Sequence, residues 1–115
     1  MNTKDSTEAV QRHEFQARVF QALAHPIRLA IVEALRQGEV CVCEIAAGLG
    51  AERSNISRHL ALMQRSGVLA SRKEGLQVLY RLRTPCILDF LSCATRVARG
   101  HLEEASIPTL DHVQR

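Results

Sequence analysis

Apolar residues in the first third of the chain recur at the spacing of α-helices. They fall every four positions from Phe15 to Leu23, which predicts a helix over residues 13–24. Pro26 marks a new start, because proline lacks an N–H donor and is tolerated in the first turn of a helix but not in its interior. The segment that follows, PIRLAIVEALRQG, predicts a second helix with one apolar face, which ends near Gly38.

The middle of the chain has the pattern of two short helices joined by a turn. In CVCEIAAGLG, two apolar residues four positions apart predict a short helix, and Gly50 allows a tight turn after it. A second helix is predicted over residues 53–66, with Ile56, Leu60 and Met63 facing inward and mostly polar side chains facing outward. Two short helices joined by a glycine-containing turn are typical of a helix-turn-helix motif.

A basic hairpin and a last helix follow this motif. The segment VLASRKEGLQVLYRLR predicts two strands joined near Gly75, where a positive φ is expected. Thr84 is a candidate N-cap and Pro85 a candidate first residue of a helix that continues through ILDFLSCATRVARGHLEE. This order predicts a mainly α fold with a β-hairpin wing (α+β), which is the winged helix-turn-helix class.

The length of 115 residues suits one domain with one modest hydrophobic core. We expect this domain over residues 13–104, with a flexible N-terminal arm over residues 1–12 and a C-terminal tail over residues 105–115. No apolar run approaches the roughly 20 residues of a membrane helix, and the polar N-terminus lacks the apolar stretch of a secretory signal. The sequence therefore predicts a cytoplasmic protein without a membrane partner, whose thiols stay reduced.

Positive charge is concentrated in the centre of the chain. The net charge of the whole protein is only +3, but residues 53–83 contain seven Lys and Arg residues against the single acid Glu74, a balance of +6. The segments before and after this one are slightly acidic. Such a distribution is expected of a surface that binds a polyanion, although an ordinary solvated basic face is the alternative interpretation.

Polar side chains of the second short helix and the hairpin suit contacts with double-stranded DNA. Asn55 and Arg58 are candidates for bidentate hydrogen bonds to adenine and guanine, and the basic hairpin suits the phosphate backbone or the minor groove. For His59 local packing is an alternative, and His25 is expected to be structural. The candidate DNA-binding residues are Ser54, Asn55, Ser57, Arg58, His59, Arg72, Lys73 and Arg81.

Two cysteines one residue apart, Cys41 and Cys43, stand at the start of the first short helix. In a cytoplasmic protein, four cysteines favour metal ligation or redox sensing over structural disulfides. Residues i and i+2 of a regular helix point about 200° apart, so two thiolates there cannot hold one ion. Either Cys41 lies just outside the helix, or the first turn unwinds on binding. Both options couple ligation to the backbone beneath the following helix.

Three segments together resemble the ArsR/SmtB family of metal-responsive repressors: ALAHPIRLAIVEAL, VCVCEIAAGLG and SNISRHLALMQRSGVLASRKEGLQVLYRL. The resemblance covers roughly residues 15–83, and the Cys-x-Cys stretch is similar to that of the arsenic-responsive branch. It implies a homodimer formed through the first and last helices and bound to a palindromic operator. It also implies release from DNA when As(III) or Sb(III), acting as inducer, binds Cys41 and Cys43.

The sequence departs from the family pattern at two places. Arsenic sensors of this type often have a third cysteine where this chain has Ala46, so the third ligand would be Cys93 or Cys86, from either subunit, or a small thiol. Cys93 also lies on an apolar stripe, where core packing is the alternative. The zinc pattern of the last helix is incomplete, because Leu88 and Phe90 occupy the first two ligand positions.

Other functions remain open at this point. A repressor of the same fold that senses thiol oxidation or persulfide is one alternative, and a sensor of Cd(II), Pb(II) or Zn(II) is another. A winged helix that binds only proteins is a third. Because no βαβ pattern accompanies the cysteines and no nucleophile–base pair stands out, we expect the protein not to be an enzyme.

Overall fold

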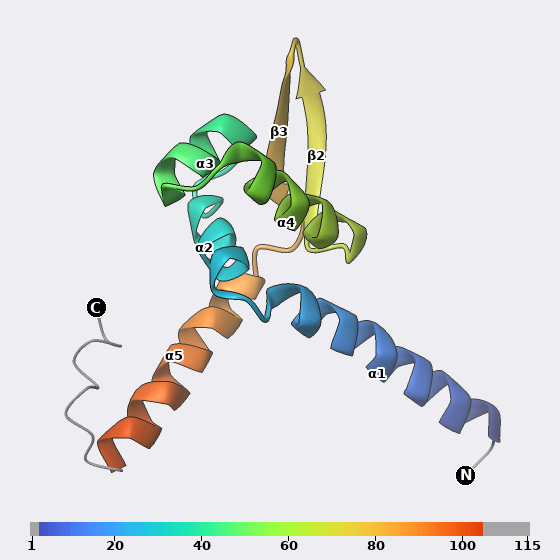
Figure 1. Cartoon of the computed structure of the whole chain (residues 1–115). Coiled ribbons are helices and arrows are strands. Elements are labelled where there is room, and N and C mark those ends of the chain that lie inside the picture. The colour runs from blue at the N-terminus through green and yellow to red at the C-terminus, as the bar shows by residue number, and fades with distance from the viewer. Residues whose placement is uncertain (1–2, 105–115) are drawn as a thin grey trace. The chain divides into compact units, whose positions relative to one another are not determined.

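The computed structural model describes residues 3–104, and the side chains of residues 6–102. The chain divides into two compact units, Met1–Thr84 and Pro85–Arg115. In its described part, the first unit holds helices α1 to α4 and strands β1 to β3, and the second holds helix α5 (Figure 1). The first unit has the order helix-turn-helix followed by a hairpin, so the predicted winged helix-turn-helix class is confirmed.

Helix α1 (Thr3–Leu23) begins ten residues before the position that the apolar pattern predicted. Residues 3–12 contain no Gly or Pro and several strong helix formers, so intrinsic propensity extends the helix beyond its apolar stretch. Among the residues of α1 whose side chains are described, 6–23, only Ala22 and Leu23 are buried. The predicted division at residue 12 stays a prediction, and the predicted tail over residues 105–115 lies outside the described residues.

Helix α2 (Pro26–Ala34) is started by two adjacent residues. Pro26 occupies the first turn, and the Nδ1 atom of His25 accepts a hydrogen bond of 3.1 Å from the backbone N–H of Ile27. This bond satisfies one of the N–H groups that a helix start leaves without an intrahelical partner. The prediction that His25 is structural is therefore confirmed.

The helix-turn-helix motif consists of α3 (Val42–Leu49) and α4 (Arg53–Arg65). The turn between them begins with Gly50 in the left-handed conformation, with φ of +62°, where a side chain would be strained. The three apolar residues predicted to face inward from α4, Ile56, Leu60 and Met63, are all fully buried. They form the core of the first unit together with Ile31, Val32, Leu35, Ile45 and Leu69.

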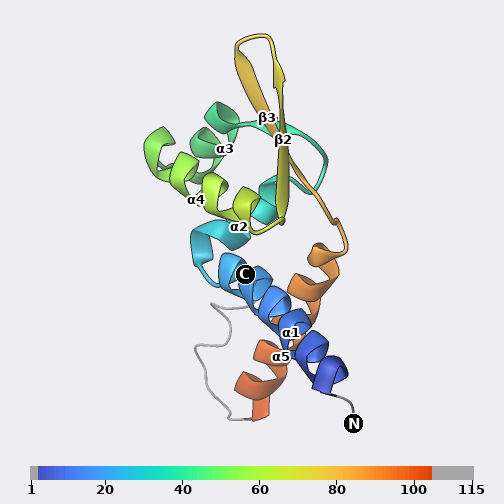
Figure 2. The same cartoon turned by 90° about the vertical axis from the view of Figure 1, so that its right-hand side faces the viewer.

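A three-stranded antiparallel sheet adjoins the motif. Strands β2 (Leu69–Glu74) and β3 (Gln77–Leu82) form the predicted hairpin, and Gly75 adopts the predicted positive φ. The hairpin, called the wing below, projects beyond the helices of its unit (Figures 1 and 2). A two-residue strand, β1 (Val40–Cys41), pairs with the other side of β3, so the order is β1-β3-β2.

Helix α5 (Ile87–Glu104) is the predicted last helix, and it begins two residues after Pro85. Before it, the backbone N–H groups of Leu88 and Asp89 bond to the carbonyl groups of Pro85 and Cys86, which is a turn rather than a helix. Such a shift is within the usual uncertainty of a helix end. No helix in the described part of the chain is long and apolar enough to cross a membrane.

Candidate nucleic-acid interface and thiol pair

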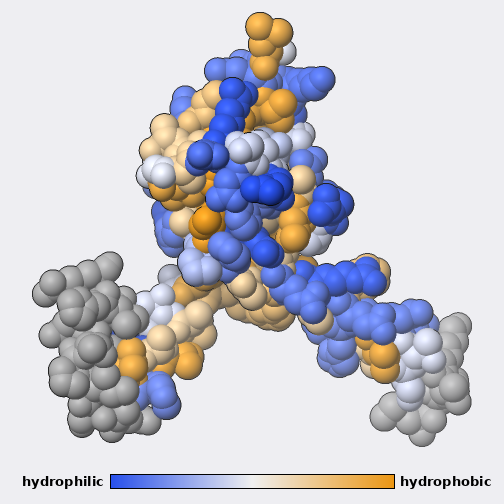
Figure 3. Space-filling view, in the orientation of Figure 1, coloured by the Kyte–Doolittle hydropathy of each residue, from blue (hydrophilic) through white to orange (hydrophobic). Residues whose placement is uncertain are grey.

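The outward side of α4 presents the predicted recognition residues. Ser54, Ser57 and Arg58 are exposed, whereas Asn55 and His59 are half-buried at the edge of the helix. Much of the surface over α4 is hydrophilic (Figure 3). Because the opposite face of α4 is anchored in the core, the polar face is held toward solvent with groups that can reach base edges and phosphates.

His59 also packs against the start of α2. Its ring lies 4.7 Å from the ring of His25, measured between centroids, with an angle of 50° between the planes. Partial burial lowers the pKa of His59, and the neighbouring His25, Arg28 and Arg58 lower it further. His59 is therefore expected to be neutral near pH 7, and part of its ring is committed to a contact within the protein.

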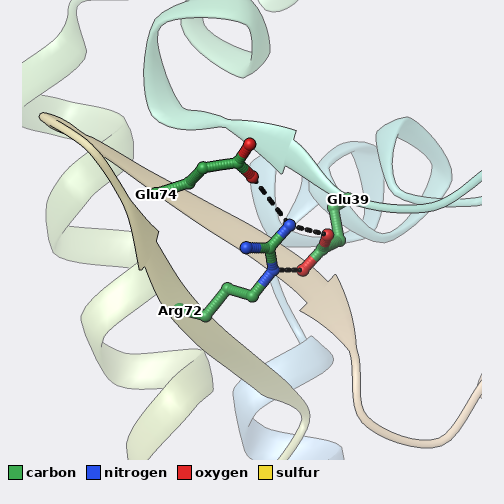
Figure 4. A network of polar contacts seen from close by, with 3 residues as sticks. All are labelled: Glu39, Arg72 and Glu74. Atoms are coloured by element: carbon green, nitrogen blue, oxygen red, sulfur yellow. Dashed lines mark hydrogen bonds and ion pairs between the residues drawn. The ribbon is translucent and has the colours of Figure 1, made fainter.

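Two wing residues, Arg72 and Glu74, form a network of charged side chains with Glu39, which directly precedes β1 (Figure 4). The guanidinium of Arg72 donates two hydrogen bonds to the carboxylate of Glu39, of 2.8 and 2.9 Å, and one of 2.8 Å to Glu74. The hydrogen bond from Arg72 is the main reason why the pKa of the Glu39 carboxyl lies below its ordinary value. The pKa of Arg72 is raised, mainly by its bond to Glu39. Two carboxylates thus neutralise one of the predicted DNA-binding cations.

The other predicted wing residues differ from Arg72. Lys73 and Arg81 are exposed, and no ion pair involves either of them among the described residues. The turn of the wing carries Leu76, which is fully exposed, and the tip of the wing is correspondingly hydrophobic in Figure 3. The wing therefore presents two available cations, Lys73 and Arg81, beside an apolar tip, whereas Arg72 is bound to Glu39 and Glu74.

The two neighbouring cysteines occupy different environments. Cys41 is only 5% exposed and is the N-cap residue of α3, with extended backbone angles, so it lies outside the helix. Cys43 is in the first turn of α3 and is exposed. Of the two predicted options, a residue outside the helix is the one found. Cys41 also pairs with Leu79 of β3, so it belongs to the wing sheet and to the start of α3 together.

The remaining cysteines, Cys86 and Cys93, are both exposed in the second unit. Cys93 therefore does not pack in a core within its own unit, although its apolar stripe made core packing an alternative. All four cysteines are free. Among the described residues, no group of three or more His, Cys, Asp or Glu side chains is arranged to hold a metal ion.

Glu39 belongs to the candidate interface, although no sequence pattern singled it out. Its partner Arg72 is 33 positions away on β2, and the two come together because β1 and β2 both pair with β3. Strand β1 itself has two residues, too few to show an alternating pattern. The sequence contains only one hint of this contact, which is that Glu39 is an acidic residue two positions before the Cys-x-Cys stretch.

Comparison with known proteins places this geometry among bacterial regulators. Residues 25–71 match the family described as "Bacterial regulatory protein, arsR family". The chain is 34% identical over 91 residues to an uncharacterized HTH-type transcriptional regulator of Mycobacterium tuberculosis, covering 78% of this chain and 80% of that protein. It is 47% identical over 66 residues to the arsenical resistance operon repressor of Escherichia coli, covering 56% of each.

The fold is similar to that of solved structures. The solution structure of a homodimeric winged helix-turn-helix DNA-binding domain from Mycobacterium bovis superimposes with a TM-score of 0.71. The two chains are 29% identical, and the match covers 90% of this chain and 93% of the other.

Proposed function

Because this chain belongs to the ArsR/SmtB family of transcriptional repressors, we propose that it is an arsenic- or antimony-responsive member, released from operator DNA when Cys41 and Cys43 bind As(III) or Sb(III). The family and the relatives are transcriptional regulators, not enzymes, and the chain has the family's DNA-binding winged helix-turn-helix.

For DNA binding, α4 would enter the major groove with its outward side. Asn55 and Arg58 would read base edges, and Ser54, Ser57 and His59 would contact phosphates or base edges. Lys73 and Arg81 would reach the backbone beside the wing, whereas Arg72 would do so only after leaving its carboxylate partners. The charge of +6 on residues 53–83 supports this assignment.

A homodimer would double these contacts. Large apolar side chains are exposed on both α1 and α5: Phe15 and Phe20 on the first, Phe90 and Val97 on the second, each at least 57% exposed. Exposed apolar surface of this kind marks an association site. A homodimer through these two helices would bury it, and its twofold symmetry would select a palindromic operator.

One observation carries the regulatory part of the proposal: Cys41 is both the N-cap residue of α3 and a paired residue of the wing sheet. Its thiol is buried, whereas the thiol of Cys43 is exposed two residues further along. Binding of one ion by both thiolates is therefore proposed to move the backbone at the start of α3. Since α3 packs on α4 and β1 pairs with β3, the shift reaches both DNA-contacting elements.

The donor set suits a soft ion. Thiolates prefer soft ions, and Cys41 and Cys43 would supply two of the three sulfur ligands of a pyramidal As(III) or Sb(III) centre. No third ligand accompanies them among the described residues, so Cys93, Cys86 or a small thiol would complete the site. A closed four-ligand site for Zn(II) is supported less by this arrangement.

Arsenite titration of a DNA complex tests the proposal. A fluorescent duplex from the promoter of the protein's own gene is bound by wild type, Cys41→Ser and Cys43→Ser, and release is followed by anisotropy. We expect arsenite to release the wild type only, with all three proteins binding DNA equally in its absence. Cys86→Ser and Cys93→Ser then identify the third ligand. Retention of DNA by the wild type in saturating arsenite would refute the proposal, and release by peroxide or persulfide instead would favour a redox sensor.

A further inference from the structure

Three arginine side chains converge on one recess in the first unit. The recess has a volume of about 450 Å³ and lies between the end of α1, the start of α2 and the end of α4. Arg18, Arg28 and Arg65 line it, one from each helix. The other lining residues, none of them acidic, are Gln21, Ala22, Leu62 and Ser66.

The position of Arg28 is fixed by contacts within the protein. One terminal nitrogen of its guanidinium donates a hydrogen bond of 3.0 Å to the backbone carbonyl of Gln21, at the end of α1. Its Nε atom is buried and has no hydrogen-bond partner. A buried N–H group of a charged side chain is costly to leave unpaired, and the side chain that carries it lines the recess.

The charge of the recess is not balanced by the protein. The ion pairs among the described residues involve Arg36 and Arg72, and none of the three recess arginines takes part in one. The ends of α1 and α4 contribute partial negative charge, which favours arginine there. Two such ends supply about one negative charge in total, and the start of α2 supplies about half a positive charge, so about 2.5 positive charges remain.

The recess continues the outward side of α4. Arg58, Leu62 and Arg65 are four and three residues apart, so they follow one side of the helix. Arg28 lies near enough to that side for its charge to lower the pKa of His59. Seven residues of helix span about 10.5 Å, which is close to the width of about 12 Å of the major groove.

We infer that this recess binds a phosphate-type oxyanion, and that its occupant is a backbone phosphate at the edge of the operator groove read by α4. Guanidinium groups bind phosphate oxygens with paired, charge-assisted hydrogen bonds. The recess is open to solvent, as a phosphate that belongs to a duplex requires. The assignment to DNA rests on the proposed DNA binding, whereas the anion site itself does not.

Salt dependence of DNA binding tests the occupant. The double variant Arg18→Gln/Arg65→Gln removes two exposed cations but keeps Arg28 and its bond to Gln21. The matched control, Arg12→Gln/Arg96→Gln, removes the same charge from exposed positions that lie outside the recess and take part in none of the described ion pairs. Thermal melting by circular dichroism checks that both variants are folded.

We expect the slope of log K against log salt to be shallower by about 1 for each phosphate that the recess variant no longer neutralises, and to stay closer to wild type in the control. A slope that changes equally in both variants would overturn the assignment to DNA.

Titration with inorganic phosphate, followed by calorimetry, separates a free anion from a DNA phosphate. If the wild type binds phosphate at millimolar concentration and only the recess variant loses this binding, the anion site is supported. If the recess variant also keeps the wild-type salt slope of DNA binding, the occupant is a free anion and not a DNA phosphate. If the wild type binds no DNA at all, the proposed function fails, and the phosphate titration alone decides the recess. A recess variant that keeps both the wild-type DNA slope and the wild-type phosphate affinity would overturn the inference entirely.

Discussion

Helix α4 and the wing both carry basic residues predicted to bind DNA, but they hold them in opposite ways. On α4 the anchor is apolar: one face is fully buried, and Arg58 on the other face has no carboxylate partner among the described residues. On the wing, Arg72 is bound by Glu39 and Glu74. The number of positive charges in a segment is therefore not the number available to a polyanion.

Removing the apolar anchor should have the largest effect. Leu60→Ala deletes a fully buried side chain, and we expect the free energy of unfolding to fall by about 2–5 kcal/mol. Leu76→Ala makes the same change at the fully exposed tip of the wing and should alter stability by less than about 0.5 kcal/mol. Urea denaturation of both variants measures the contrast, and equal losses would contradict the burial difference.

Neutralising one arginine on each element should separate their contributions to DNA affinity. We expect Arg58→Gln to weaken operator binding by roughly 1–3 kcal/mol, because it removes an available base-reading side chain. Arg72→Gln should weaken binding much less, since its charge is already compensated. Anisotropy titrations at one salt concentration compare them, and a larger effect of Arg72→Gln would reverse our interpretation of the wing.

Weakening the ion pairs of Arg72 should make its charge more available to DNA, as the charge of Arg58 on α4 already is. We expect Glu39→Gln to strengthen DNA binding and to steepen its salt dependence by up to about 1, because Arg72 keeps only its bond to Glu74 and is more readily drawn to a phosphate. Glu33→Gln, which breaks the exposed ion pair to Arg36 on α2, is the matched control and should leave binding nearly unchanged.

The effect of Glu39→Gln should also depend on pH. The lowered pKa of Glu39 means that its ion pair is present above the ordinary pKa of a glutamate and is lost as the pH falls through the lowered value. The two proteins should therefore converge in DNA affinity at acid pH. A difference that persists in acid would show that the charge of Glu39 is not its cause.

The smallest effect is expected where α4 meets the start of α2. Because the pKa of His59 is lowered, the unfolded chain takes up its proton first as the pH falls. Stability should therefore decrease as the pH falls through the ordinary pKa of histidine toward the lowered one. His59→Gln should flatten this dependence, whereas His13→Gln, an exposed control, should not. Urea midpoints measured across the pH series provide the test.

The elements that were predicted well from the sequence are those with a local cause. The buried face of α4, the positive φ of Gly75 and the start of α2 at Pro26 follow from periodicity, turn chemistry and proline geometry. The early start of α1 was missed because it depends on propensity without an apolar pattern. The link from Glu39 to Arg72 was missed because it depends on strand pairing between distant segments.

For the candidate thiol site, the position of Cys41 relative to the helix could be predicted from the sequence, but its place in the sheet could not. The spacing of Cys41 and Cys43 predicted either that Cys41 lies outside the helix or that the first turn unwinds on binding, and the extended backbone of Cys41 agrees with the first option. That Cys41 would also belong to a sheet could not be predicted from a two-residue strand.

The junction between β1 and α3 has a consequence for how such repressors diversify. Residues 39–43 hold the wing arginine, complete the sheet and begin α3, yet they include none of the outward residues of α4. If the proposed function holds, substitutions within these five positions would change which chemical stimulus is detected while the preferred base sequence stays the same. Lineages with this layout would then acquire new stimuli without having to relocate their binding sites in the genome.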